Sequence, residues 1–286
     1  MCGGLNNEKC CIQLENNTWS LHSYLNSERE AASSVATDRA TFLFGGTEGS
    51  HTYEYLPINS SKWQPGVRKI PNGFSDGSAI PVSENEIWLI GGEPVDDSNQ
   101  GRSFGSSIGM AKGGTFSNIS SFIAFICDNL KVLGQHVPSC RPCHYSFDSN
   151  NRRILSFDIR SHTFTELPLT LNQGRSGHRC SYIPGSNSIL VTGGTDGDGS
   201  MISSTEIIDL ATRSIFRSAN MKRERCSHSI GILTIDNQEK VAVVGGWSNQ
   251  WLYGIETYDP VKNLWDVSSI KLDEPRYDGG FLTVKC

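Results

Sequence analysis

Cysteines and histidines between residues 136 and 144 form the densest group of candidate metal ligands in the sequence. The run CRPCH at 140–144 matches the C-x-x-C-H pattern of haem attachment, which needs export and an open pocket, and neither is indicated. Zinc fits the chemistry better, because His136, Cys140, Cys143 and His144 offer nitrogen and sulfur ligands, although adjacent Cys143 and His144 strain to reach one ion. A disulfide or free thiols are the third interpretation. We therefore assign no metal and no cofactor.

A second candidate, GSSIG at 105–109, matches the G-x-S-x-G nucleophile elbow of hydrolases. That motif needs a strand, a sharp turn and a helix, and no helical pattern follows it, so a Gly/Ser loop is preferred. The run DGDG at 196–199 lacks the 12-residue frame of a calcium loop and is interpreted as a turn. Since no complete catalytic set remains, we expect that the chain is not an enzyme.

Four arginines recur at one place in a repeating pattern, each just before a strand-like segment: Arg29, Arg175, Arg225 and Arg276. Two of them continue as Arg-x-x-His, which adds His178 and His228. Guanidinium groups bind carboxylates and phosphates through paired hydrogen bonds, so these six residues are candidate partner-binding residues. Two alternatives stay open: each arginine satisfies carbonyl groups inside the fold, and the two histidines share a metal ion.

The elements that must position these residues are short strands that end in paired glycines. The clearest example is VAVVGGWSNQWLYGIETYDPVKNLW at 241–265. Its β-branched valines favour a strand, its glycines allow positive φ and close approach by another backbone, and Asp-Pro followed by Asn favours a turn. The unit therefore predicts strand, glycine exit, loop, strand, turn and strand.

The glycine doublet recurs with a regular spacing. Its first members lie at 3, 45, 91, 193 and 245, so three intervals fall between 42 and 52 residues and one, of 102, equals about two units. Gly134-Gln135 follows a short apolar run and divides the long interval, which gives six units. The predicted repeat glycines are Gly3, Gly4, Gly45, Gly46, Gly91, Gly92, Gly134, Gly193, Gly194, Gly245 and Gly246.

The second half of the unit repeats as well. Tyr258-Asp259 with Trp265 aligns with Phe157-Asp158 and Phe164, with Ile208-Asp209 and Ile215, with Leu56-Pro57 and Trp63, and in shortened form with the run ending at Trp19. Glu54, Glu206 and Glu256 occupy a further shared position.

Together, the doublet after an apolar strand, the Glu-x-Tyr-Asp-Pro run, the Trp that follows and the Arg-x-x-His start resemble the kelch repeat, and nearly the whole chain resembles it. The resemblance implies an all-β, six-bladed β-propeller with four antiparallel strands in each blade around a central channel. Residues 93–152 depart from the pattern, so the third and fourth blade region is expected to be degenerate. The resemblance also implies that the loops after strand two and before strand one share a partner-binding face.

The two ends of the chain are expected to complete one closing blade, because each end lacks the strands that the other supplies. We predict a single domain over 1–286, with the closing blade shared between residues 1–25 and 276–286, which removes two free sheet edges. Cys2 and Cys10 flank the first glycine exit on neighbouring strands, so a disulfide between them is geometrically reasonable in an oxidising compartment.

Composition narrows the class of partner. The chain of 286 residues has 25 basic and 30 acidic groups without long runs of either sign, so we expect no nucleic-acid partner. No apolar window reaches the length of a membrane span, and the start lacks a signal pattern, so a cytoplasmic location is favoured. An extracellular location is the alternative, given nine cysteines and glycosylation sequons at Asn16, Asn59 and Asn118, although about three sequons arise by chance in such a composition.

The expected function is a non-enzymatic interaction module that presents loops and an arginine-lined channel mouth to a protein or peptide partner, with an acidic segment as one option. A secreted or surface propeller that binds a glycan or receptor is one alternative. A metal-dependent enzyme on the same scaffold, similar to copper oxidases, is the other, although their set of two His and two Tyr ligands cannot be assigned here.

Overall fold

The computed structural model describes residues 10–15, 18–29, 31–46, 49–94, 152–235 and 238–273. These residues fall into two compact units. The first unit contains the described residues up to Ser75, and the second contains Asp76–Pro94 together with the described residues from 152 onward. Every named element among them is a β-strand, and none of the described segments is a helix long and apolar enough to cross a membrane.

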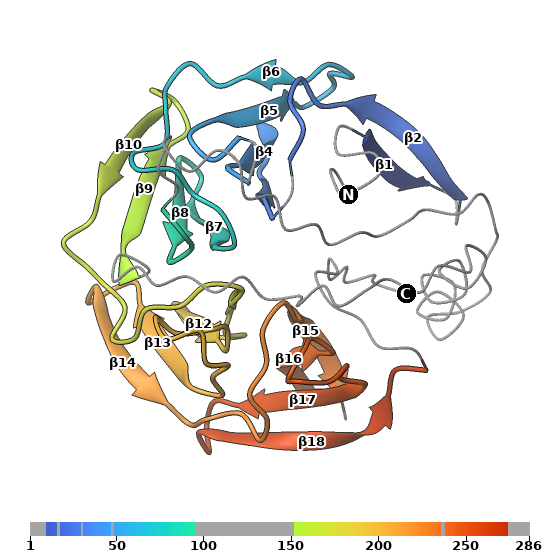
Figure 1. The fold of residues 1–286 in the computed structure, drawn as a ribbon, viewed down its shortest axis with the longest axis vertical. Coiled ribbons are helices and arrows are strands. Elements are labelled where there is room, and N and C mark those ends of the chain that lie inside the picture. Colours follow the sequence, from blue (N-terminus) through green and yellow to red (C-terminus); the bar gives the residue numbers. More distant parts are fainter. Residues whose placement is uncertain are drawn as a thin grey trace. The chain divides into compact units, whose positions relative to one another are not determined.

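The first unit holds one hairpin and one four-stranded sheet. The hairpin pairs β1 (Cys10–Glu15) with β2 (Thr18–Tyr24) in antiparallel fashion. The sheet, called blade 1, contains β3 (Ser33–Ala36), β4 (Ala40–Phe44), β5 (Tyr53–Pro57) and β6 (Gln64–Pro65) in sequence order. Its strands are all antiparallel, so each connects to the next by a short turn or loop (Figure 1).

The second unit holds three more antiparallel four-stranded sheets. Blade 2 contains β7 (Ser78–Ser83), β8 (Glu86–Ile90), β9 (Ile154–Asp158) and β10 (Thr163–Glu166). Blade 3 contains β11 (Arg179–Tyr182), β12 (Ser188–Thr192), β13 (Thr205–Asp209) and β14 (Ser214–Ser218). Blade 4 contains β15 (Ser229–Ile235), β16 (Gln238–Val244), β17 (Gly254–Asp259) and β18 (Leu264–Lys271). The first strand of blade 3, β11, contacts the first strands of both neighbours, β7 and β15.

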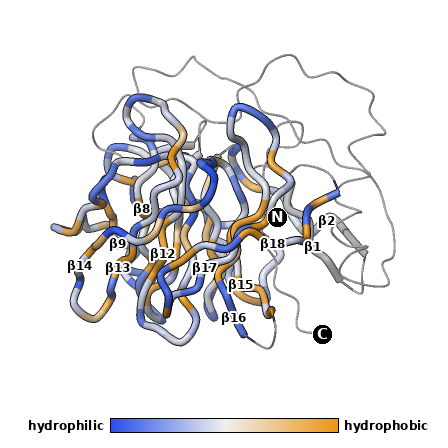
Figure 2. Tube along the Cα trace, turned by 90° about the horizontal axis from the view of Figure 1, so that it is seen from below, coloured by the Kyte–Doolittle hydropathy of each residue, from blue (hydrophilic) through white to orange (hydrophobic). Residues whose placement is uncertain are grey.

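Apolar side chains between successive sheets hold the second unit together. One buried cluster joins Trp88 and Ile90 of blade 2 to Ile189 and Val191 of blade 3. A second cluster joins blade 3 to blade 4 and includes Trp265. In Figure 2 hydrophobic stretches are visible along strands of this unit, such as β12 and β15. Blade 3 is therefore buried on both faces, since Ile189 and Val191 of β12 pack toward blade 2 and Leu190 packs toward blade 4.

The prediction of six units is not confirmed, because the described residues contain four four-stranded blades. The doublet Gly91-Gly92 and the later pair Phe157-Asp158 were assigned to successive units, whereas β8 pairs directly with β9 inside blade 2. The interval of 102 residues is therefore lengthened by a segment between two hydrogen-bonded strands. The expected strands around Gly134 and the closing strand at 276–284 lie outside the described residues.

The glycine doublets are required by backbone approaches at the end of each second strand. Gly193 and Gly194 have φ values of +59° and +99°, a region that other residues rarely adopt. A Cβ on Gly193 would lie 2.4 Å from the carbonyl oxygen of Arg225 in the next blade. A Cβ on Gly194 would lie 2.4 Å from the carbonyl oxygen of Ser176 in its own blade. The missing side chain of Gly193 therefore allows close approach by the segment before blade 4, and that of Gly194 allows close approach by the segment before blade 3.

Candidate functional site

Three of the four candidate arginines lie within the described residues, and the side chains of all three are buried. Arg29, Arg175 and Arg225 are 2%, 0% and 1% exposed. In blade 4, Arg225 Nη1 donates to the carbonyl oxygen of Gly245 at 2.7 Å, and Nη2 donates to Glu256 Oε1 at 2.5 Å. Arg175 makes the same pair of contacts in blade 3, to Gly193 at 2.7 Å and Glu206 at 2.8 Å. Each guanidinium thus joins the glycine exit of strand two to strand three of the same blade.

The carboxylate in each pair also accepts two backbone hydrogen bonds from the segment just before the arginine. Glu256 accepts from the N–H groups of Lys222 at 2.6 Å and Arg223 at 3.2 Å. Glu206 and Glu54 accept from the equivalent backbone groups at 172–173 and 26–27. We call the buried arginine, the strand-three glutamate and these two N–H groups the Arg–Glu network. It fixes where the chain enters the first strand of a blade.

Burial lowers the pKa of all three arginines, and the paired glutamate opposes that shift in each case. A buried charge of this kind needs its partner, because desolvating an unpaired ion is costly. The guanidinium groups are therefore committed to the interior of their blades. Contact between these side chains and a partner remains a hypothesis, and their burial argues against it; the alternative that they satisfy carbonyl groups inside the fold agrees with the geometry.

The positions that correspond to the Arg–Glu network by sequence and by strand pairing are apolar in blade 2 and in the segment that precedes it in the chain. Strand pairing places Leu155 where the other blades have glutamate, since Leu155 faces Leu89 as Glu206 faces Val191. Phe74 stands at the arginine position, because its carbonyl accepts the N–H of Gly46 as that of Arg225 accepts from Gly194. Three residues earlier is Pro71, which has no N–H to donate. The cation, the carboxylate and one backbone donor are thus absent together.

His178 and His228 lie fully buried at equivalent positions in blades 3 and 4. His228 Nε2 lies 2.8 Å from Thr192 Oγ1 in the preceding blade. The equivalent neighbour of His178 is Ile90, so His178 has no side-chain hydrogen bond among the described residues. Burial, followed by the nearby arginines, lowers the pKa of both histidines well below its usual value, so both rings are neutral near pH 7. Their position indicates a structural role between blades.

Some of the other residues predicted from the sequence lie within the described part of the chain. Gly45, Gly46, Gly91, Gly92, Gly193, Gly194, Gly245 and Gly246 all have positive φ at the ends of second strands. Trp63 and Trp265 are buried, and each indole N–H donates a hydrogen bond, to Ser23 Oγ and the carbonyl oxygen of Ala219 respectively. Trp19 and Cys10 lie in β2 and β1. Arg276, Gly3, Gly4, Gly134, Cys2 and the motifs at 105–109 and 136–144 lie outside the described residues.

The aspartates and cysteines of the described residues form no metal site. Asp196 Oδ1 accepts the backbone N–H groups of Asp198 and Ser200, so this run is a turn, as predicted. Within the described segments no group of three or more His, Cys, Asp or Glu side chains is placed to hold a metal ion. Cys226 is disulfide-bonded, and burial raises the pKa of the Cys180 thiol to about 12.

A group of exposed aromatic side chains lies in the loop after the second strand of blade 4. The sequence analysis did not predict it. Trp251 and Tyr253 are 39% and 43% exposed in the loop between β16 and β17. The Trp247 ring supports Trp251 in a T-shaped contact, with centroids 4.7 Å apart. The available signal was the loop composition, which is WSNQWLY in blade 4 and TDGDGSM in blade 3.

Two exposed cations lie on the neighbouring loop. Lys222 and Arg223 are exposed in the segment that leads into β15. Backbone hydrogen bonds between Cys226 and Trp247, at 3.0 and 3.1 Å, join this segment to the aromatic loop. Ser248 Oγ also donates to Glu224 Oε1 at 2.7 Å. We call Lys222, Arg223, Trp247, Trp251 and Tyr253 the Trp251 surface.

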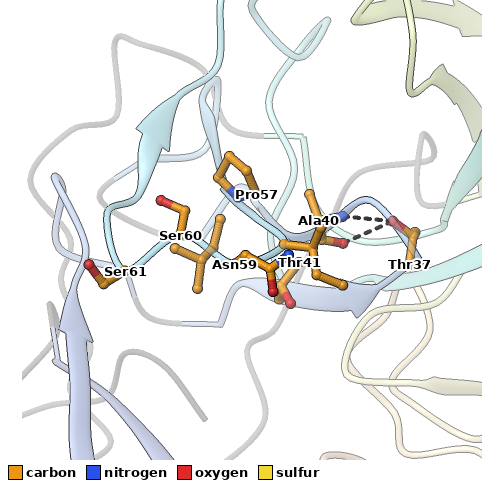
Figure 3. A pocket seen from close by; sticks show the side chains of 9 residues that line it. Thr37, Ala40, Thr41, Pro57, Asn59, Ser60 and Ser61 are labelled. Carbon is orange, nitrogen blue, oxygen red and sulfur yellow. Dashed lines mark hydrogen bonds between the residues drawn. The ribbon is translucent and has the colours of Figure 1, made fainter.

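A separate open pocket of about 440 Å³ lies on blade 1 in the first unit. Its lining combines aliphatic groups of Leu56, Pro57 and Ile58 with the hydroxyl groups of threonines and serines (Figure 3). Thr37 Oγ1 bonds to the backbone of Ala40 at the rim. The pocket carries no cluster of ionisable side chains.

Comparison with known proteins supports the fold alone. No protein-family model matches the chain, and no curated protein matches it. Among 267 matching chains of known structure, the one described as "Structure of YjhT" has a TM-score of 0.65 at 15% sequence identity. The alignment covers 98% of this chain and 85% of that one. The protein therefore has an all-β propeller fold, a scaffold that hosts many unrelated functions, so function must come from its surfaces.

Proposed function

We propose that this protein is a non-enzymatic β-propeller that binds a protein or peptide partner through the Trp251 surface of blade 4. The observation that carries the proposal is the pair of exposed aromatic side chains, Trp251 and Tyr253, in a loop that is hydrogen-bonded to the segment with exposed Lys222 and Arg223. Trp, Tyr and Arg are the residues most often found at the energetic centres of protein interfaces. The spacing of the glycine doublets and of the Arg and Glu positions supports a kelch-type repeat as the underlying unit.

Rigidity is a second reason to prefer this surface. The aromatic loop is fixed to the segment before β15 by two backbone hydrogen bonds, and the Arg–Glu network fixes that segment to Glu256. A rigid loop loses little conformational entropy on binding, which favours affinity. Lys222 and Arg223 add local positive charge, so a partner segment that carries carboxylates is the best match.

The proposal is tested with the full chain and two variants in blade 4. W251A/Y253A removes the aromatic contacts, and V261A is the matched control, since Val261 is 93% exposed in the turn between β17 and β18. Partners are collected by quantitative affinity capture with the unmodified chain, and the affinity of each purified partner is then measured for both variants. We expect at least a tenfold weaker affinity for W251A/Y253A, about 1.4 kcal/mol, and less than a twofold change for V261A. Equal affinities for all three proteins would refute the assignment.

A second candidate is an extracellular propeller that binds a glycan or a receptor. The disulfide of Cys226 favours it, because disulfides persist in oxidising compartments. Counting free thiols in denatured, unreduced protein from its native cells separates the two candidates. An intracellular interaction module should show nearly all nine thiols free, whereas an extracellular protein should show several blocked until reductant is added.

A further inference from the structure

The turn between β5 and β6 in blade 1 carries the sequence Asn59-Ser60-Ser61, which is an N-glycosylation sequon. The chain reverses tightly here, because the Ser60 N–H donates to the carbonyl oxygen of Pro57 at 3.0 Å. Asn59 has a φ of +62° and is exposed, and its neighbour Ile58 is also exposed. This sequon is the one that lies wholly within the described residues, since Asn118 and part of the sequon at Asn16 lie outside them.

The equivalent turns of the other three blades are built differently. Each begins with an aspartate at the end of its third strand, Asp158, Asp209 or Asp259, and the carboxylate accepts two backbone N–H groups of the turn. The residue with positive φ comes four positions later in those turns. Blade 1 has Pro57 instead of aspartate and places Asn59 at positive φ only two positions later. Its turn therefore lacks the aspartate bonds, and the Asn59 side chain is exposed.

The side chains that glycosylation needs are available. Neither the Asn59 carboxamide nor the Ser61 hydroxyl has a hydrogen-bond partner within the described part of the chain, and both residues are exposed. The Ser60 hydroxyl, in contrast, bonds to the backbone of Lys62 at 3.1 and 3.2 Å. Asn59, Ser60 and Ser61 line the open pocket of blade 1 (Figure 3), which gives a first sugar room to lie against Pro57 and Ile58.

We propose that Asn59 is an N-linked glycosylation site of this protein. In the reaction, the carboxamide nitrogen of Asn59 bonds to the anomeric carbon of an oligosaccharide carried on a lipid diphosphate. The bond between that carbon and the phosphate breaks, the lipid diphosphate leaves, and the nitrogen loses one proton to a base of the transferase. No electrons are exchanged with an outside reagent. The Ser61 hydroxyl supplies the recognition group that the sequon requires.

The disulfide of Cys226 is an independent observation that agrees with this modification, because glycosylating compartments are also oxidising. The inference does not rest on partner binding by the Trp251 surface, which belongs to blade 4. A glycan on blade 1 would decide the compartment in favour of the extracellular alternative.

The test uses the full chain, expressed behind an export signal in insect cells, with three variants. N59Q removes the acceptor, S61A removes the recognition hydroxyl, and S60A is the matched control because it leaves the sequon intact. Secreted protein is digested with trypsin, and the peptide from Ala40 to Lys62, which contains no other sequon, is analysed by mass spectrometry before and after glycosidase treatment. The same peptide is then analysed in protein isolated from its native cells.

We expect a glycosidase-sensitive glycan on Asn59 in most unmodified and S60A molecules, in both sources. The glycan should disappear in N59Q and S61A while these variants are still secreted with native circular dichroism spectra. An unmodified Asn59 in secreted, folded protein, an unmodified Asn59 in native cells, or a modification that survives S61A would each overturn the proposal.

Discussion

Replacing Arg225 with phenylalanine should destabilise the protein strongly, because it separates a buried ion pair. The change removes the hydrogen bonds to Gly245 and Glu256 and leaves the Glu256 carboxylate, which is 2% exposed, with only two backbone donors. Removing one partner of a buried pair costs about 3–5 kcal/mol. We therefore expect the free energy of unfolding of R225F to fall by about that amount.

The sequence offers a set of compensating changes, since the segment before blade 2 has Pro71 and Phe74 and strand β9 has Leu155 at the corresponding positions. The triple variant R225F/E256L/K222P copies that apolar set into blade 4. Replacing a buried ion pair with well-packed apolar groups is often neutral or stabilising, so the triple variant should lose no more than about 2 kcal/mol. The three substitutions should therefore be strongly non-additive, because R225F and E256L each leave one buried charge unpaired and the costs of the single variants sum to well above the cost of the triple variant.

The measurement is urea unfolding followed by tryptophan fluorescence and by circular dichroism, with coincident transitions required for each variant. Arg223→Ala is the control, because that side chain is exposed, and it should change stability by less than about 0.5 kcal/mol. A cost below about 1 kcal/mol for R225F would show that the Arg–Glu network does not stabilise the blade. A triple variant no more stable than R225F would show that the apolar set does not replace the network.

Three other predictions concern buried groups. The pKa values of His178 and His228 are lowered, so below about pH 6.5 the unfolded state binds protons that the native state excludes. The free energy of unfolding should therefore be constant above about pH 7 and fall below about pH 6.5, by up to about 1.4 kcal/mol per pH unit for each histidine. Urea titrations between pH 8 and 5 measure this dependence, and a flat profile would contradict it. Gly193→Ala should lower the free energy of unfolding, measured by thermal unfolding, by more than about 2 kcal/mol. The control Gly185→Ala should lower it by about 1 kcal/mol, because Gly185 also has positive φ but no atom lies within 4 Å of its Cβ position. Equal losses would show that the close backbone approach at Gly193 has no effect. The Cys180 thiol should resist alkylation at pH 8 until the protein is unfolded, and rapid reaction in native protein would refute its raised pKa.

The sequence predicted the regular blades well because their constraints are local. The doublet at Gly193 and Gly194 and the aspartate turn at Asp259 depend on φ angles and on hydrogen bonds over a few residues. The same locality misplaced Phe157-Asp158, because a strand signature does not reveal which earlier strand it pairs with when a long segment intervenes. The pairing of β8 with β9 is a long-range contact that cannot be derived from the spacing of repeats.

The candidate site was harder to predict because burial decides its role. Arg225 and Glu256 were both recognised as repeated positions, but their pairing depends on a first and a third strand meeting at one end of the sheet. The joint replacement by Phe74 and Leu155 in blade 2 was a sequence signal for that pairing and was overlooked. Exposure of Trp251 could not be predicted from sequence, since another tryptophan of the same blade, Trp265, is buried.

Arginine-selective labelling with a dicarbonyl reagent, read by mass spectrometry on native protein, tests the buried role of the arginines most directly. Arg160, Arg213 and Arg223 are exposed and should react within the first time points. Arg175 and Arg225 should remain unmodified until the protein is unfolded, because their guanidinium groups are enclosed and bonded to Glu206 and Glu256. Labelling of Arg175 or Arg225 at the rate of Arg223 in folded protein would contradict this role and would restore the arginine-lined channel mouth as the binding site.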